Sequence, residues 1–142
     1  MIRRVVQMDP TGCGIACAAM LGRTTYSRAK SLAVDLNIVS SKPPYYIDTG
    51  SLKLLLCALG LTLSKGGKLT HWHSLHCLSV VGVNYNERNS TWHWVVYVPT
   101  QDGGYVLDPR MSVTTARRTD FLKMRPRSFV SVAHLHQDQH RR

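Results

Sequence analysis

Apolar residues in the first half of the chain recur at the spacing of α-helices. Residues Cys13–Leu21 are small or apolar throughout, and Gly22 is placed to end a helix there. Ser27 can cap a second helix. Its apolar positions lie three and four residues apart, at Ala29, Leu32, Ala33 and Leu36. A third helix is predicted from about residue 51 to residue 59, with Gly60 ending it.

The second half of the chain changes to the pattern of β-strands. Val, Trp and Tyr are enriched in segments that clusters of turn residues separate. The predicted strands are residues 76–83, 92–98, 105–107 and 129–133, with a short helical turn around residues 119–123. Helices first and an antiparallel sheet second predict an α+β domain. We expect a single domain over residues 1–133 and a polar, disordered tail over residues 134–142.

Composition places the chain among soluble globular proteins. It has 142 residues, of which 44% are hydrophobic and 18% are charged, which excludes a disordered chain. No apolar run reaches the roughly 18 residues of a membrane helix, and no apolar segment of a secretory signal follows the N-terminus. We therefore expect a cytoplasmic protein, unless a dedicated system exports it, and free thiols at all four cysteines.

The formal net charge of +10 is large for a chain of this size. It predicts attraction to an acidic protein, a nucleic acid or an anionic surface, although solvated surface charge is the simpler explanation. The basic residues concentrate late in the chain, at Arg110, Arg117, Arg118, Lys123, Arg125 and Arg127. On one face beside a cleft they would steer an acidic substrate.

Cys13 stands where the first helix is predicted to begin. The unpaired N–H groups and the macrodipole at a helix N-terminus favour a thiolate, which is the reactive form of cysteine. Gly12 and Gly14 flank Cys13, so a substrate carbonyl can approach the sulfur closely. Taken alone, a cysteine in this context is more often a small core residue.

Two further residues complete a possible catalytic group. His93 lies within an aromatic and β-branched strand, where its ring nitrogens need partners, and Asp108 follows the next strand. A hairpin between these strands places both residues side by side, so that Asp108 can orient the imidazole. A satisfied core histidine and an ordinary turn aspartate are the alternatives for each residue alone. Together with Cys13 they have the order and types of a nucleophile, a base and an orienting group.

Four ordered motifs carry a resemblance to a known family. They are Gln7 with the segment 13–21, Thr49–Leu52 with Leu59–Leu61, Trp92–Val96, and Leu107–Pro109. Their order resembles that of the C39 peptidase family, the papain-like domains of bacteriocin-processing exporters, from about Val5 to Val132. The resemblance implies a papain-like fold, with the nucleophile helix packed on the C-terminal sheet. The membrane and ATPase parts of the exporters have no counterpart in this sequence, so we expect a standalone domain.

The resemblance also implies an activity. It predicts a cysteine peptidase that hydrolyses a peptide or isopeptide bond through Cys13, His93 and Asp108 and an acyl-enzyme, with Gln7 in the oxyanion hole. Many members of the family have Asp before the cysteine, where this chain has Gly12. Cleavage of a leader peptide after two glycines is thus one substrate class among several. Deamidation and transpeptidation share the acyl-enzyme, and a catalytically silent module that binds nucleic acid through the basic residues is the rival interpretation.

The remaining candidate residues are interpreted as structural. Cys17 lies one helical turn after Cys13 and is predicted to be buried, as are Cys57 and Cys77. The segment His71–Cys77 contains three histidines but lacks the paired spacing of structural zinc modules, so we expect neither a metal nor a cofactor. The three tryptophans, Trp72, Trp92 and Trp94, are expected to pack in the core more than to line a substrate groove. The expected partner is a protein or peptide substrate, acidic if the basic residues steer it.

Overall fold

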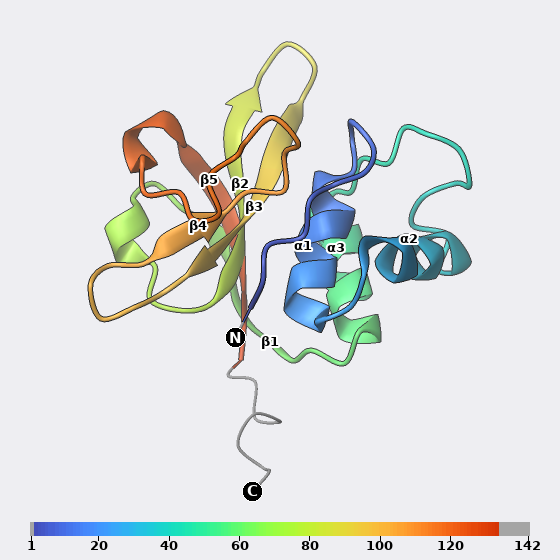
Figure 1. Ribbon diagram of the computed structural model, residues 1–142, viewed down its shortest axis with the longest axis horizontal. Coiled ribbons are helices and arrows are strands. Elements are labelled where there is room, and N and C mark those ends of the chain that lie inside the picture. Colours follow the sequence, from blue (N-terminus) through green and yellow to red (C-terminus); the bar gives the residue numbers. More distant parts are fainter. Residues whose placement is uncertain (1, 134–142) are drawn as a thin grey trace, which may run out of the picture.

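Three helices and five strands form two layers in the computed structural model, which describes residues 2–133 (Figure 1). The helices are α1 (Cys13–Gly22), α2 (Tyr26–Asp35) and α3 (Thr49–Ala58). The strands are β1 (Leu63–Lys68), β2 (Ser79–Asn86), β3 (Thr91–Val98), β4 (Tyr105–Leu107) and β5 (Pro126–Val132). They form one antiparallel sheet in the order β1-β5-β2-β3-β4. The predicted α+β class, with helices first and sheet second, is confirmed.

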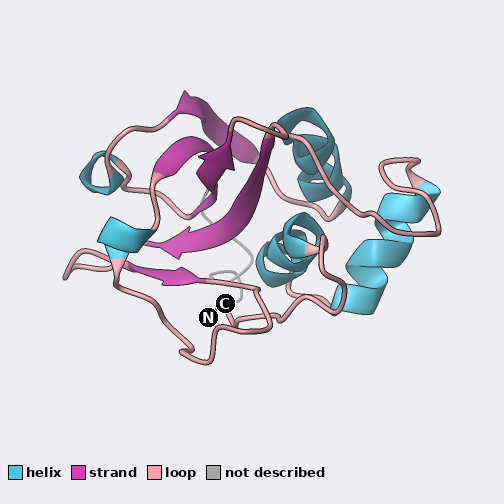
Figure 2. Ribbon diagram, turned by 90° about the horizontal axis from the view of Figure 1, so that it is seen from above, coloured by secondary structure: helices cyan, strands magenta, loops and turns pink. Residues whose placement is uncertain are grey.

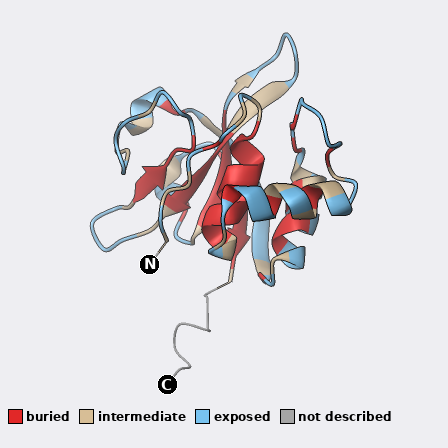
Figure 3. Ribbon diagram, turned by 45° about the vertical axis from the view of Figure 1, so that its right-hand side comes forward, coloured by how far each residue is buried: buried red, intermediate tan, exposed pale blue. Residues whose placement is uncertain are grey.

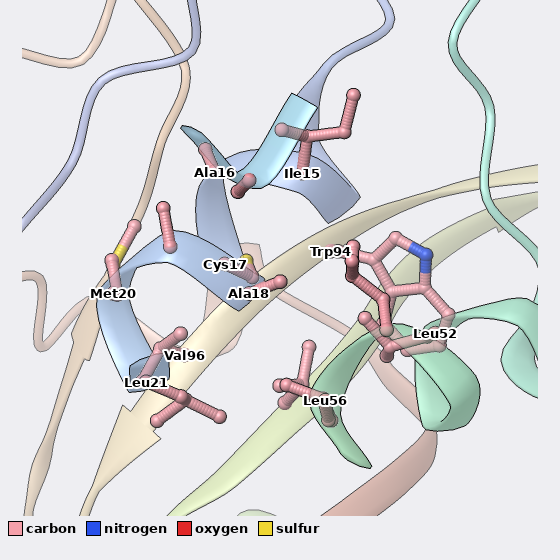
Figure 4. Packing of buried hydrophobic residues seen from close by; sticks show 14 of the residues in the cluster. Ile15, Ala16, Cys17, Ala18, Met20, Leu21, Leu52, Leu56, Trp94 and Val96 are labelled. Carbon is pink, nitrogen blue, oxygen red and sulfur yellow. The ribbon is translucent and has the colours of Figure 1, made fainter. Parts of the chain in front are cut away.

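Helix α1 is the centre of the fold because its sequence is apolar on every side. All residues from Cys13 to Leu21 are buried, as expected for a helix that neighbours cover all round. The sheet covers one side of α1 and the other two helices cover the opposite side (Figures 2 and 3). In Figure 4, Trp94 and Val96 of β3 and Leu52 and Leu56 of α3 pack around it. This packing fixes the position of the N-terminus of α1 relative to β3.

Two predicted helix boundaries were wrong in their details. Thr25, and not Ser27, caps α2: its extended backbone lets its Oγ accept from the N–H of Arg28 at 3.1 Å. Ser27 lies inside the first turn of the helix, where it cannot serve as the cap. The left-handed residue after α1 is Arg23, at φ 55°, and not Gly22.

The strands at Tyr105–Leu107 and around Trp92–Val98 are confirmed, and the other predicted boundaries shift. Strand β2 begins at Ser79, and a 3-10 turn, η1 (Trp72–Ser74), lies a few residues before it. Strand β5 begins at Pro126, two residues after the helical turn η2 (Phe121–Lys123) ends. Strand β1 was not predicted. Its sequence holds two glycines and two lysines on an exposed edge and shows no alternation of apolar residues.

The sheet is packed on both faces. One face, with Trp94 and Val96, packs against the helices. The other face, with Val95 and Tyr97, is covered by a smaller cluster from the connecting segments, which includes Trp72. The predicted tail over residues 134–142 lies outside the described residues. Across residues 2–133, no helix combines the length and the apolar character needed to cross a membrane.

Candidate active site

The sulfur of Cys13 lies at the junction of the helical layer and the sheet. Cys13 is the first residue of α1, and its Sγ accepts a hydrogen bond from the N–H of Trp94 at 3.4 Å. The first bond of the helical ladder runs from Ala16 N to Gly12 O at 3.0 Å. The N–H groups of Cys13, Gly14 and Ile15 precede that ladder, as at any helix start. Cys13 is 9% exposed, so the sulfur is largely shielded but can still be reached.

Gly12 is required by a tyrosine on the next helix. A side chain at this position would overlap the hydroxyl of Tyr26. That hydroxyl donates to Asp9 Oδ2 at 2.7 Å, and Lys30 Nζ lies 3.3 Å from the same oxygen. The burial of Tyr26, together with its hydrogen bond to Asp9, raises the pKa of the phenol above its usual range. A larger residue than glycine therefore does not fit at position 12 while Tyr26 keeps this place.

His93 and Asp108 lie together, at the end of the β3–β4 hairpin. Strand β4 pairs with β3 in the register Val96↔Leu107, and Asp108 directly follows β4. His93 Nε2 lies 2.7 Å from Asp108 Oδ1. Burial opposes protonation of the ring, but the hydrogen bonds to Asp108 and Cys13 outweigh it, so the pKa of His93 is raised. The three residues expected from the sequence thus lie in one region: Asp108 contacts the His93 ring, and the Cys13 sulfur contacts the backbone of Trp94, the residue after His93.

Asp108 is fully buried and is held by three donors. Besides His93, the N–H of Arg110 donates to Oδ1 at 2.9 Å and Arg118 Nη1 donates to Oδ2 at 2.7 Å. Burial alone would raise the pKa of this carboxyl, but the bonds from His93, the Arg110 N–H and Arg118 hold it well below its usual range. Asp108 is therefore ionised at neutral pH despite its burial.

Arg118 is a site residue that the sequence interpretation placed differently. It was grouped with the solvent-facing basic residues, yet it makes a two-sided contact, with Asp108 and with Asp120. Its Nε and Nη2 donate to the two Asp120 oxygens at 2.9 and 2.7 Å. The backbone of Arg118 also forms an antiparallel bridge with Val106 of β4. The only sequence signal was Asp120 two residues later, which indicates a local pair but does not indicate Asp108.

The N-terminal segment ties down the residues that follow Asp108. Arg4 donates from Nε to Asp108 O at 2.6 Å, and from Nη2 to Arg110 O at 2.8 Å and Val113 O at 2.6 Å. The N–H of Gln7 donates to Pro109 O at 2.8 Å. These bonds keep the segment after β4 against the rest of the site.

The side chain of Gln7 is buried beside the turn that leads into α1. Its Nε2 donates to Asp9 O at 2.9 Å and to Pro10 O at 3.0 Å, so both amide N–H groups have acceptors. Its Oε1 is buried and has no hydrogen-bond partner among the described residues. Exchanging the two amide atoms would set Oε1 against two carbonyl oxygens, so this orientation is the favourable one. The amide therefore lies near the nucleophile helix with its donors already engaged.

A cavity of about 150 Å³ opens beside Cys13. Its aromatic walls are Tyr46, Trp92 and Trp94, and Ile47 adds to the apolar lining. The expectation for the tryptophans holds for Trp94, which is buried in the core, whereas Trp92 is only half-buried and also faces this cavity. Trp72 lies on the other face of the sheet, where its Nε1 donates to Met124 O at 2.7 Å.

The remaining cysteines differ in burial, and the histidines of residues 71–76 form no metal site with neighbouring residues among those described. Cys17 is fully buried, as predicted, and its burial raises the pKa of its thiol. The prediction for Cys57 and Cys77 was wrong, because both are exposed, although all four cysteines are free thiols. Cys57 lies on the side of α3 that faces away from its buried residues. His71 and His73 stack on each other at 5.3 Å, and no set of three or more His, Cys, Asp or Glu within residues 2–133 could hold a metal ion.

Comparison with solved structures places this arrangement in a known fold. The chain is similar to a double-glycine-motif protease from an AMS/PCAT transporter, solved in complex with the leader peptide. The TM-score is 0.64 at 16% identity, over 93% of this chain and 91% of that one. It is also similar to the peptidase domain of Streptococcus ComA, a bifunctional ABC transporter of a quorum-sensing pathway. Here the TM-score is 0.65 at 18% identity, over 94% and 98% of the two chains. The fold is that of C39-like peptidase domains.

The similarity to these proteins is much clearer in the structure than in the sequence. No protein-family model matches the sequence, and no curated protein matches it either. The similarity is thus carried by the structure, at sequence identities of 16% and 18%. The predicted papain-like architecture, with the nucleophile helix packed on the antiparallel sheet, is confirmed.

Proposed function

We propose that this C39-like domain is a cysteine peptidase with Cys13 as nucleophile, His93 as base and Asp108 as the orienting group. The observation that supports it is the contact of His93 with the buried Asp108 carboxylate, beside a Cys13 sulfur that accepts from the N–H of Trp94, the residue next to His93 in β3. A cysteine at the first position of a helix, beside an imidazole that a carboxylate orients, is the geometry of an activated thiol.

In this mechanism the Asp108 carboxylate selects the tautomer of His93. Because Nε2 faces Asp108, it carries the proton, and Nδ1 is left to accept the proton of the Cys13 thiol. The thiolate then attacks the carbonyl carbon of the substrate, and the imidazolium returns its proton to the leaving amine. Water activated by His93 hydrolyses the resulting thioester and releases the acid.

The oxyanion of the tetrahedral intermediate needs donors near Cys13. The backbone N–H of Cys13 is one donor, because it precedes the helical ladder. We assign the second to Gln7 Nε2, which would exchange the carbonyl of Pro10 for the oxyanion when substrate binds. One such donor contributes about 3 kcal/mol to the transition state. Gln7→Glu, which removes the donor but keeps the shape, should slow acylation roughly 100-fold.

The substrate in this proposal is a peptide segment. One structural neighbour is a protease solved with a leader peptide, which supports a peptide rather than a small amide. The narrow cavity of about 150 Å³ beside Cys13, with its tryptophan walls, fits small residues next to the reacting bond. Peptides with a Gly-Gly pair are therefore the first substrates to test.

The test is selective alkylation of one thiol, in which the sulfur displaces the carboxylate of an acyloxymethyl ketone and forms a thioether. Because Cys57 and Cys77 are exposed, we would use the Cys57→Ser/Cys77→Ser variant and a Gly-Gly peptide carrying an acyloxymethyl ketone. We expect labelling of Cys13, mapped by peptide mass spectrometry, with none at buried Cys17. His93→Ala should slow labelling at least about 100-fold. Labelling of Cys13 no faster than that of Cys17 would show that the proposed function is wrong.

The same variant separates hydrolysis from related reactions of the acyl-enzyme. Peptide hydrolysis produces two fragments, deamidation leaves the peptide intact, and transpeptidation joins the acyl part to an added amine. Mass spectra of peptides incubated with the enzyme distinguish all three. We expect two fragments and their loss in Cys13→Ala.

A further inference from the structure

A basic groove of about 770 Å³ lies next to the β2–β3 hairpin, outside the Cys13 cavity. We call it the basic groove. Its charged and aromatic walls are Lys68, Tyr85, Glu87, Arg88, Arg125 and Arg127. The hairpin, which projects beyond the rest of the sheet in Figure 1, borders both hollows. Residues 84–88 line the basic groove, and residues 90–92 line the cavity beside Cys13.

The cations of the basic groove have no carboxylate partners within residues 2–133. Lys68, Arg88, Arg125 and Arg127 are exposed, and none forms an ion pair there. Four positive side chains thus face a single acid, Glu87. Elsewhere, Arg118 and Lys30 do have carboxylate partners. The groove is therefore electrostatically complementary to a ligand with several negative charges.

Arg127 is positioned by stacking. Its guanidinium lies 3.5 Å from the centre of the Tyr85 ring. This contact uses the face of the guanidinium and leaves its N–H groups directed outward in the plane, where they can bind a carboxylate with two hydrogen bonds. The stack thus fixes the donor before any ligand arrives, which lowers the entropic cost of binding.

A row of aromatic rings connects the basic groove to the nucleophile. The ring centres of Tyr85 and Trp92 are 6.2 Å apart, and those of Trp92 and Trp94 are 5.6 Å apart. The backbone N–H of Trp94 in turn contacts Cys13 Sγ. An extended peptide advances about 3.3 Å per residue, so the steps from the Trp94 ring through Trp92 and Tyr85 to Arg127 correspond to about five residues.

We propose that the basic groove binds acidic side chains of the peptide substrate, about five residues from the bond that Cys13 attacks. This inference rests on the proposed peptidase function and specifies its substrate class. A single-stranded nucleic acid fits less well. Its binding requires open aromatic faces for base stacking, whereas Arg127 covers one face of Tyr85 and Trp92 lies near its ring.

Binding is tested without chemistry, in the Cys13→Ala variant of the 142-residue chain. The probe is a fluorescein-labelled twelve-residue peptide with four glutamates, and the control probe has glutamines in their place. By fluorescence anisotropy, Arg125→Gln/Arg127→Gln should weaken binding of the glutamate probe about fivefold or more, since each exposed ion pair contributes modestly. The effect should shrink at high salt. Arg127→Lys keeps the charge but loses the stacked guanidinium, so its affinity for the glutamate probe should lie between those of the unsubstituted groove and the double variant.

The matched control is Arg3→Gln/Arg28→Gln, which removes the same charge from exposed positions outside the basic groove. If both double variants weaken binding equally, the effect is one of net charge and the inference is wrong. Equal affinity for the glutamate and glutamine probes would also overturn it. So would an oligonucleotide that binds through Arg125 and Arg127 when the glutamate probe does not.

The link to the nucleophile is tested with the acyloxymethyl ketone peptides. A glutamate pair is moved from two to eight residues away from the reactive group, and labelling of Cys13 should be fastest near five. Arg125→Gln/Arg127→Gln should abolish this optimum and leave the rate of a peptide without glutamates unchanged. If Cys13 is labelled normally but at the same rate for every position of the glutamate pair, this inference is wrong and the proposed function is unaffected. Absence of Cys13 labelling with every peptide overturns the proposed function instead, and anisotropy then decides whether the groove binds acidic peptides.

Discussion

Arg118→Ala should be among the most destabilising single substitutions away from the apolar core. The Asp108 carboxylate is fully buried, and Arg118, whose side chain is 17% exposed, is the cation that compensates it at 2.7 Å. Truncating Arg118 leaves a buried carboxylate with only His93 and the N–H of Arg110 as donors. The loss should appear as lower stability and as poorer orientation of His93.

The magnitude follows from the burial of the two partners. Removing one member of a buried ion pair costs about 3–5 kcal/mol. Two donors remain on Asp108, so we expect about 3 kcal/mol, the lower end of that range. The other contact of Arg118, with exposed Asp120, adds only about 0.5 kcal/mol. Arg118→Lys, which keeps a charge but loses the fork, should cost about half as much.

The assay is a double-mutant cycle by urea unfolding. Asp108→Asn removes the buried charge, so adding Arg118→Ala to it should cost only about 1 kcal/mol. A coupling of about 2 kcal/mol between the two substitutions is expected. If Arg118→Ala costs the same in both backgrounds, the arginine does not compensate Asp108 and the reasoning fails. Asp120→Asn, with a coupling below about 1 kcal/mol, is the control for the exposed pair.

Two other predictions concern pH and packing. Burial opposes ionisation of Asp108, but His93, the Arg110 N–H and Arg118 hold its pKa low, so its contribution to stability is present above about pH 4 and lost as pH falls further. Burial lowers the pKa of His93, but its hydrogen bonds to Asp108 and Cys13 raise it more. The stability that protonated His93 contributes to the fold is therefore complete below about pH 6.5 and is lost as pH rises through the folded-state pKa. Urea unfolding midpoints measured across pH should show both slopes. The acidic slope should be absent in Asp108→Asn and the slope at higher pH in His93→Gln, and unchanged slopes would contradict this assignment. Gly12→Ala should destabilise by about 2 kcal/mol through overlap with the Tyr26 hydroxyl, and less in a Tyr26→Phe background. The control Gly50→Ala, whose added carbon would meet only Asp48 Oδ1 at 3.7 Å, should be neutral or stabilising in thermal unfolding.

The parts of the site that local pattern specifies were predictable from sequence. The apolar run after Gly12 places Cys13 at a helix start, and the short connection between β3 and β4 forces the hairpin that brings His93 to Asp108. The exposure of Cys57 was also predictable, since Leu52, Leu55 and Leu56 define the buried face of α3. Hydrophobic periodicity specifies such features because burial of one face dominates local energetics.

Features that depend on irregular segments were not predictable in the same way. Arg118 reaches Asp108 from a loop with no hydrophobic period, and the nearby Asp120 indicates only a local pair and not the contact with Asp108. The amide of Gln7 satisfies two carbonyls of the turn before α1, a contact set by turn geometry and not by residue type. Strand β1 is an edge strand with few apolar residues, so pairing with β5 alone determines it.

The Asp108 carboxylate explains why the site needs segments that supply no reactive group. A carboxylate that orients an imidazole must stay ionised. It must also be shielded from water, so that water does not compete for its hydrogen bond with His93. Burial alone would protonate it. The segment after β4 resolves this conflict by supplying the Arg110 N–H and the Arg118 guanidinium, and Arg4 and Gln7 anchor that segment through its carbonyls. Truncating Arg118 or Arg4, the two positions that act through their side chains, should therefore affect the same carboxylate and couple with each other. Substitutions in the basic groove should leave the reactivity of Cys13 toward small electrophiles intact.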